Sequence, residues 1–220
     1  MSRDTILERP TQPSQPAILT PAELERISQA IGQAERETRA EIRVVVASGG
    51  VVGHPFHAIL WAALAALIVP WGIIAVLPMR PVSLLAIQAG CFIVLGLVFT
   101  RPQVAARIVP LAARRQAARA RALELFHAHG LHQTEARSGL LIFVAPRDRL
   151  VEIVADEGVQ AAIPHEAWTS LCGAVVERAG EGALAEGIAA AVSQAGALLA
   201  PHLPAVPGDK NELSDRVVLI

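Results

Sequence analysis

The sequence has few of the residues on which several common protein chemistries depend. Only two of its 220 residues are cysteines, which is too few for a disulfide framework. Lysine occurs once, at Lys210, and no phosphate-binding loop of the form GxxxxGK followed by Ser or Thr is present. HExxH, GxSxG and a glycine-rich loop between a strand and a helix are also missing. These absences argue against P-loop kinases, zinc proteases, α/β-hydrolases and dinucleotide-dependent dehydrogenases.

The chain also has almost no net charge and few aromatic side chains. Its formal charge is −1 and aromatic residues make up 4% of it, which argues against a basic nucleic-acid binder that stacks bases. Hydrophobic residues make up 53% of the chain, and this share excludes a disordered protein. We therefore expect a folded protein that does not bind nucleic acid.

The apolar residues are concentrated in a stretch that is almost free of charge. Between Val44 and Thr100 the only charged residue is Arg80. This stretch holds apolar runs at 56–77 and 82–100, and about 20 apolar residues are enough for a helix to span a bilayer. The short turn between the runs predicts a two-helix transmembrane hairpin over residues 55–100. A buried helical hairpin in a soluble protein is the alternative.

Arginines follow the second apolar run and predict the orientation of the chain. Residues 101–121 hold six arginines and no acidic residue. The positive-inside rule then predicts a two-pass protein of a bacterial inner membrane, with both termini and the globular domain in the cytoplasm. These arginines act as a topology determinant, and some of them are also candidates to contact anionic lipids. The candidates for lipid contact are Arg101, Arg107, Arg114 and Arg115.

The polar regions on the two sides of the hairpin predict one split α/β domain. Thr20 and Glu23 form a capping-box pattern, which predicts a helix over residues 20–38 after a disordered tail at 1–19. A strand at 41–48 follows and completes the first part of the domain at 20–50. Periodicity in residues 101–200 predicts helices at 111–129, 164–179 and 181–200, strands at 139–145 and 150–155, and a loop at 156–163. Residues 201–220 read as a C-terminal tail.

Four short segments resemble the TPM domain family. They are 35–46 (ERETRAEIRVVV), 138–144, 151–158 (VEIVADEG) and 209–213 (DKNEL). The sequence is most similar to a bacterial branch of uncharacterised membrane proteins, in which a TPM domain encloses two spans. The resemblance implies a small Rossmann-like α/β/α sandwich with a mixed sheet, interrupted here after its first strand by the hairpin. It also implies activities that differ between members, since some are acid phosphatases or calcium binders and others are accessory proteins of membrane complexes.

Acidic residues near strand ends are the candidates for a functional site. Enzymatic members of the family carry an acidic turn ahead of the first helix, whereas residues 10–19 here contain no Asp or Glu. Asp156 stands where the family has acidic residues and is the candidate catalytic residue. Glu41, Asp156 and Glu157 are the candidates to bind a divalent cation such as calcium, because hard cations prefer oxygen ligands. The alternative is that these carboxylates are solvated or cap a loop.

Three histidines are weaker candidates for a metal site. His127, His129 and His132 lie close together in the sequence, and imidazole is a common zinc ligand. Their spacing also suits a helix C-terminus, where histidine interacts favourably with the helix dipole. No other cofactor is indicated.

These features lead to two hypotheses about function. The first is a non-enzymatic, membrane-anchored TPM-like domain that binds or stabilises another membrane protein, with homo-oligomers left open. The second is a membrane-tethered, metal-dependent phosphatase that uses Asp156. Convergence of Glu41, Asp156 and a third oxygen donor at one solvent-open point would favour the second hypothesis.

Overall fold

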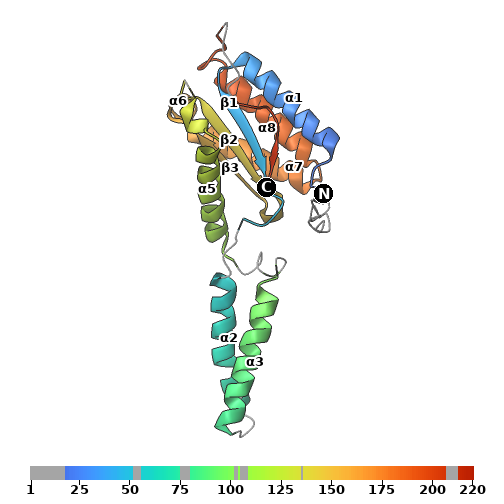
Figure 1. Cartoon of the computed structure of the whole chain (residues 1–220), viewed down its shortest axis with the longest axis vertical. Coiled ribbons are helices and arrows are strands. Elements are labelled where there is room, and N and C mark those ends of the chain that lie inside the picture. Colours follow the sequence, from blue (N-terminus) through green and yellow to red (C-terminus); the bar gives the residue numbers. More distant parts are fainter. Residues whose placement is uncertain are drawn as a thin grey trace, which may run out of the picture.

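The chain has a mixed α/β fold with a separate pair of apolar helices (Figure 1). The computed structural model describes residues 18–51, 56–74, 80–101, 104, 109–134, 136–206 and 213–220. Within these residues it contains a four-stranded sheet and seven α-helices. Most of the predicted disordered tail, residues 1–17, lies outside the described residues.

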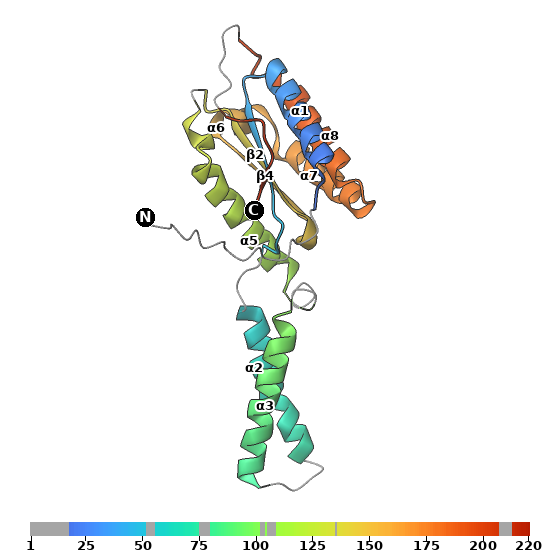
Figure 2. The same cartoon turned by 45° about the vertical axis from the view of Figure 1, so that its right-hand side comes forward.

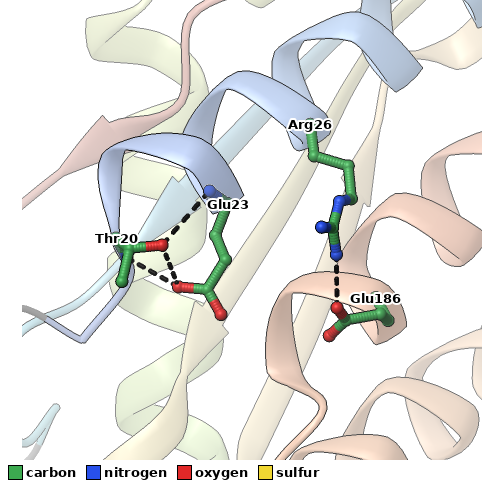
Figure 3. Close-up of polar contacts among 4 residues, drawn as sticks. All are labelled: Thr20, Glu23, Arg26 and Glu186. Carbon is green, nitrogen blue, oxygen red and sulfur yellow. Dashed lines mark hydrogen bonds and ion pairs between the residues drawn. The ribbon is translucent and has the colours of Figure 1, made fainter.

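Helix α1 (Pro21–Glu37) begins where the capping box predicts it (Figure 3). The Thr20 hydroxyl accepts a hydrogen bond from the Glu23 backbone N–H at 3.3 Å, and the Glu23 carboxylate accepts one from the Thr20 N–H at 2.6 Å. This arrangement satisfies two backbone donors that a helix start otherwise leaves unpaired. Ile27 and Ile31 are fully buried on the inner face of the helix. Further along, Arg26 forms an ion pair with Glu186 of a neighbouring helix.

The sheet combines strands from both sides of the apolar helices. Its order is β3 (Leu150–Ala155), β2 (Gly139–Ala145), β1 (Glu41–Val46), β4 (Val218–Leu219). β1 runs parallel to β2 and β4, while β3 is antiparallel to β2. All residues of β1 and β2 are buried, as expected for the two central strands. The mixed sheet is confirmed, and β4 shows that the predicted C-terminal tail contributes a strand.

Helices cover both faces of the sheet (Figure 2). Helices α1, α7 (His165–Gly180) and α8 (Leu184–Leu199) pack on one face, and α5 (Leu111–Ala128) packs on the other. Neighbouring strand residues alternate between the two cores, because successive side chains of a strand point to opposite faces. Leu140 and Ile142 belong to the first core, whereas Leu141 and Phe143 belong to the second.

The connections of the sheet differ in part from the prediction. The segment predicted as a loop at 156–163 contains a short helix, α6 (Glu157–Ala162), with Asp156 as its N-cap. The connection between β2 and β3 is a 3₁₀ turn, η2 (Pro146–Asp148), and a second 3₁₀ turn, η1 (Leu131–Gln133), follows α5. Gly130 has φ +73°, a left-handed conformation that suits glycine after a helix C-terminus.

The two apolar helices pack against each other and extend away from the α/β domain (Figure 1). They are α2 (Phe56–Ile74), which contains Pro70, and α3 (Pro81–Phe99). A row of small side chains spaced by four residues, Ala58, Ala62 and Ala66, is the buried side of α2. Small side chains at this spacing let two helix backbones approach closely.

One of the two helices meets the length and composition of a membrane span. This helix is α3, whose mean hydropathy is 2.4 and whose span is 0% buried within the protein. The described apolar stretch of α2, Ala58–Ile73, is shorter, and residues 75–79 of the predicted first span lie outside the described residues. A crossing of the membrane by both helices therefore stays a prediction.

Candidate functional site

Asp156 acts as a helix cap at the end of β3. Its Oδ1 atom accepts a hydrogen bond from the Glu157 N–H at 2.8 Å, and its own N–H donates to the Gly139 carbonyl at 2.9 Å. The side chain is buried, and its Oδ2 atom has no hydrogen-bond partner within the described residues. Glu157 is exposed in the first turn of α6. The local structure thus favours the capping role that the sequence left open.

Glu41 lies at the same end of the sheet but on a different strand. It pairs in register with Gly139 of β2, the residue that Asp156 contacts from the other side. Strands lie about 4.8 Å apart, so the backbones of Glu41 and Asp156 are separated by roughly 10 Å. The Oε2 atom of Glu41 accepts a hydrogen bond from the Leu213 N–H at 3.2 Å, toward the C-terminal segment. No group of three or more His, Cys, Asp or Glu residues in the described ranges is arranged to hold a metal ion.

Glu41 instead belongs to an acidic cluster with Glu35 and Asp215. Glu35 accepts a hydrogen bond from the Ile42 N–H at 2.8 Å. Burial raises the pKa of Glu35 to about 8, and the negative charges of Glu41 and Asp215 act in the same direction. The cluster joins the end of α1, the start of β1 and the C-terminal segment. Sequence reasoning missed it because these elements meet only in the folded domain.

The C-terminal segment is held across β1 by further polar contacts. The guanidinium of Arg43 donates to the Ser214 carbonyl at 2.6 Å and to the Arg216 carbonyl at 3.4 Å. At the end of the chain, the Ile220 N–H donates to the Val46 carbonyl at 3.1 Å. These bonds explain why an apolar tail adds a strand to the sheet.

The three histidines lie at the C-terminal end of α5 and in η1, since His127 is in the last turn of α5, His129 is its C-cap and His132 is in η1. The rings of His127 and His132 lie with their centroids 5.0 Å apart, and His127 Nδ1 is 2.7 Å from the Leu123 carbonyl oxygen. Burial lowers the pKa of His129, and the positive charge of Arg43 lowers it further. The neutral ring is thereby favoured at His129. The metal assignment stays a prediction, and the absence of a three-ligand group within the described residues gives it no support.

The arginines predicted to contact lipid lie between the apolar helices and the domain or at the start of α5. Arg101 and Arg115 are exposed, while Arg107 lies outside the described residues. The Arg114 guanidinium donates to the Asp148 carbonyl at 3.5 Å. The Asp148 carboxylate in turn accepts a hydrogen bond from the Val51 N–H at 2.6 Å, just before the chain leaves for α2. Asp148 therefore ties the turn between β2 and β3 to the segment that leads into the apolar helices.

A groove that the sequence did not reveal runs along the edge strand β3. It has a volume of about 780 Å³ and lies between α5 and α7. Its wall on α5 carries Arg115 and Arg119, and its wall on α7 includes Trp168 and Cys172. The three elements that line it, α5, β3 and α7, are different segments of the sequence, so only the folded sheet brings them together. We call this hollow the β3 groove.

Side chains cover part of the open edge of β3. The Arg119 guanidinium donates to the Ile153 carbonyl at 2.6 Å and lies 4.0 Å from the Glu152 carboxylate. The amide of Gln160 donates to the Ala155 carbonyl at 2.6 Å. An edge strand left open is a template for pairing with another chain, and such contacts reduce that tendency.

The side chains of the β3 groove are better suited to binding a ligand than to catalysis in which the Cys172 thiolate is the nucleophile. Burial raises the pKa of the Cys172 thiol to about 12, so this thiol is protonated at neutral pH and is a poor nucleophile. Burial also raises the pKa of Glu152, while Arg119, Arg115 and His165 oppose that rise. The groove thus holds a partly buried carboxylate among positive charges.

Comparison with known proteins places these elements in a family. Residues 100–198, which run from the end of the apolar helices to α8, match the TPM domain family. This match covers just under half of the chain. The folded domain extends beyond the matched residues, because α1 and the central strand β1 precede them and β4 follows them. The recognition of this family from the four short segments is confirmed.

One solved structure shares the fold of this chain. It is the NMR structure of the BA42 protein from the psychrophilic bacterium Bizionia argentinensis sp. nov.. The similarity has a TM-score of 0.59 with 19% sequence identity and covers 94% of this chain and 99% of that one. No curated protein matches the chain in sequence. These comparisons support the fold and the family, and they do not bear on the two-span bacterial branch.

Proposed function

We propose that the chain is a membrane-anchored TPM-domain protein whose Rossmann-like domain binds or stabilises another membrane protein. The observation that carries the proposal is the exposed apolar surface of α2 and α3. Trp71, Leu85 and Leu97 are 66%, 65% and 67% exposed. Apolar patches of this extent mark surfaces that contact lipid or another protein. Immersion in a bilayer would remove this surface from water.

The position of the apolar helices in the chain supports an α/β domain that lies entirely on one side of the membrane. β1 precedes α2 and α5 follows α3, so the segments before and after the apolar helices belong to one sheet. Two crossings would therefore leave the whole domain on one face of the membrane. By the positive-inside rule, the arginines after α3 support a cytoplasmic position for that face, in a bacterial inner membrane.

Alkaline extraction of membranes tests the anchoring. The full chain should stay with the membrane pellet, whereas the double substitution Ile93→Asp and Val94→Asp should release much of it. Both side chains are 59% exposed on α3, and each charged residue costs roughly 3 kcal/mol at the centre of a membrane helix. Val206→Asp is the matched control, because Val206 is 51% exposed on the α/β domain. Release of the unsubstituted chain would contradict the anchoring.

Crosslinking in intact membranes tests the partner. A crosslink between the α/β domain and one membrane protein should recur in independent preparations and disappear when the domain is unfolded. If crosslinks are recovered only between copies of this chain, the chain forms a homo-oligomer and the proposal of a different partner protein is wrong. Absence of any reproducible crosslink in membranes that retain the chain would contradict partner binding while leaving the anchoring intact.

The metal-dependent phosphatase has less support from the arrangement of the acids. Glu41 and Asp156 each accept a hydrogen bond from a backbone N–H and lie on opposite sides of β2. Calcium in proteins takes six to eight oxygen ligands, which these two separated carboxylates do not supply. We therefore do not advance this activity.

A further inference from the structure

We propose that the β3 groove is the docking site for an acidic, amphipathic helix of the membrane-protein partner. This inference rests on the proposed function, because it assigns the surface through which the α/β domain holds that partner. Four properties of the groove carry it: the occupied hydrogen-bonding edge of its floor, its positive charge, its wall of small side chains and its length.

The floor of the groove is not open to an added β-strand. The Asp156 N–H bonds to β2, and residues of an antiparallel strand alternate between facing the paired strand and facing outward. Ile153 and Ala155 therefore turn their carbonyls outward. These carbonyls already accept hydrogen bonds from Arg119 and Gln160. A helix makes its backbone hydrogen bonds internally, so it can cover this edge without displacing either side chain.

The groove carries more positive charge than its acid neutralises. It is lined by one acid, Glu152, and by three arginines, Arg115, Arg119 and Arg149, which leaves a formal excess of two positive charges. Arg115 and Arg149 are exposed, and neither forms an ion pair within the described residues. Complementary charge across an interface steers the partner and fixes its register. The groove therefore fits a segment that presents acidic side chains.

The backbone at Arg149 favours glycine, yet an arginine occupies the position. Its φ is +54°, in the left-handed region that residues other than glycine rarely adopt. Conformations of this kind are concentrated at functional sites, where the surrounding fold holds a side chain in place despite the backbone strain. Because Arg149 lines the groove, a positive charge is kept there against the preference of the backbone.

The wall on α7 is uncharged and made of small side chains. Thr169, Gly173 and Val176 line the groove, and their spacings of four and three residues place them on one face of the helix. A Cβ atom added at Gly173 would have nothing within 4 Å, so the space above this face is open. Small residues let a second helix approach closely. A helix in the groove would thus turn apolar side chains to α7 and acidic ones to the arginines.

The length of β3 sets the length of the docked helix. The lining residues of this strand run from Leu150 to Ala155, and six strand residues span roughly 20 Å. A helix rises about 1.5 Å per residue, so about 13 residues cover the groove. This length corresponds to a short helical segment of a partner.

The arginine-rich end of the groove lies toward the apolar helices. Helix α5 begins at the end of the domain from which α2 and α3 extend, and Arg115 lies in its second turn (Figure 1). Arg149 directly follows Asp148, whose carboxylate bonds to Val51 just before the chain leaves for α2. A helix that continues from a membrane span of the partner would therefore reach this end of the groove first.

Binding of a designed peptide tests the chemistry of the site. The probe is a fluorescein-labelled peptide with the sequence LEELLEELLEELL, whose leucines and glutamates fall on opposite faces of a helix. Its fluorescence anisotropy is measured with the full chain in nanodiscs of phosphatidylcholine, and empty nanodiscs give the background. We expect saturable binding. The Kd should rise at least about tenfold in high salt, or when glutamine replaces every glutamate, because both changes remove the attraction to the arginines.

Two substitutions in the groove have matched controls outside it. Arg115→Glu should raise the Kd at least about tenfold, because like charges then face each other, whereas Arg121→Glu on the same helix should change it about twofold at most. Gly173→Leu should also weaken binding, because its side chain fills the open space. Gly180→Leu is its control, since Gly180 ends α7, has equally open surroundings and does not line the groove. An unchanged circular dichroism spectrum shows that each variant is folded.

Replacement of Arg149 by glycine separates binding from stability. Arg149→Gly should raise the Kd several-fold while the melting temperature stays the same or rises, because glycine suits a φ of +54°. An arginine with a purely structural role would give the opposite pattern, a lower melting temperature with an unchanged Kd.

Photocrosslinking in intact membranes separates this inference from the proposed function. Benzoylphenylalanine in place of Thr169 should trap the partner protein, and Gly173→Leu should remove that crosslink while Gly180→Leu keeps it. If the partner is still trapped in Gly173→Leu, the groove is not the docking site although partner binding stands. If no partner is trapped anywhere on the domain, the proposed function fails, and the peptide still shows whether the groove binds an acidic helix.

Two results with the peptide would overturn the inference. The first is equal affinity for the glutamate and glutamine peptides, since the arginines would then contribute nothing. The second is equal affinity of Gly173→Leu and Gly180→Leu for the glutamate peptide, since binding would then lie outside the groove. Crosslinks from position 169 only to a second copy of this chain would also overturn it.

Discussion

Replacement of Glu35 by glutamine should remove a large part of the pH dependence of folding stability. Glu35 accepts a hydrogen bond from the Ile42 N–H and lies beside the carboxylates of Glu41 and Asp215. Burial raises its pKa from 4.5 to about 8 in the folded chain. The folded state therefore keeps a proton on Glu35 over a pH range in which the unfolded chain has released it.

The sign and size of the effect follow from this difference. Because the folded pKa is the higher one, the folded state is favoured below about pH 4.5, and this stability is lost as the pH rises from about 4.5 to about 8. A shift of about 3.5 units corresponds to a ceiling of about 5 kcal/mol at 1.36 kcal/mol per unit. Glutamine is neutral throughout and keeps an acceptor for Ile42 and a donor for Asp215.

Urea unfolding followed by Trp168 fluorescence is the assay, in a background in which Trp61 and Trp71 are replaced by phenylalanine so that Trp168 is the only indole. The free energy of unfolding is measured for the full chain and for Glu35→Gln at about pH 5 and at about pH 9, on either side of the range in which Glu35 titrates. We expect the unsubstituted chain to lose several kcal/mol more than the variant over this interval. Glu37→Gln, an exposed carboxylate on the same helix, is the control and should keep the full loss. A Glu35→Gln variant with the same pH dependence as the unsubstituted chain would refute the reasoning.

Four further substitutions test the packing of the domain by thermal unfolding. Thr20→Ala removes the capping box and should cost about 1 kcal/mol. Gly196→Ala should cost about 1–3 kcal/mol, because its Cβ would lie 2.7 Å from the Ala34 Cβ where α1 packs on α8, and a neutral result would contradict this close approach. Gly173→Ala has nothing within 4 Å and should instead stabilise α7 by up to about 1 kcal/mol. Asp148→Ala should cost about 1–3 kcal/mol, since it leaves the partly buried Val51 N–H without its acceptor. An unchanged melting temperature would argue against a stabilising hydrogen bond between Val51 and Asp148.

Features that depend on local sequence were predictable. The start of α1 follows from Thr20 and Glu23 alone, because a capping box is formed within one helical turn. The bounds of β2 and β3 agree with the runs of apolar residues, since both strands are flanked by turn residues. The apolar runs likewise predicted the positions of α2 and α3, although not whether a membrane surrounds them.

Features that depend on distant contacts were not predictable. β4 has two residues and exists because Val45 and Val46 of β1, far away in the sequence, pair with it. Asp156 was read as a ligand candidate because a carboxylate after a strand looks the same in sequence whether it binds a cation or caps a short helix. The β3 groove combines α5, β3 and α7, and no single segment carries its signature.

Cysteine labelling in intact cells tests the membrane-anchored topology most directly. Both native cysteines are first replaced, and single cysteines are introduced as Arg80→Cys, before α3, and Ser214→Cys, in the C-terminal segment. A membrane-impermeant maleimide should label the cysteine at position 80 in intact cells and the one at position 214 only after permeabilisation. Labelling at 80 only after permeabilisation, or labelling at 214 in intact cells, would contradict a cytoplasmic domain anchored by two crossings.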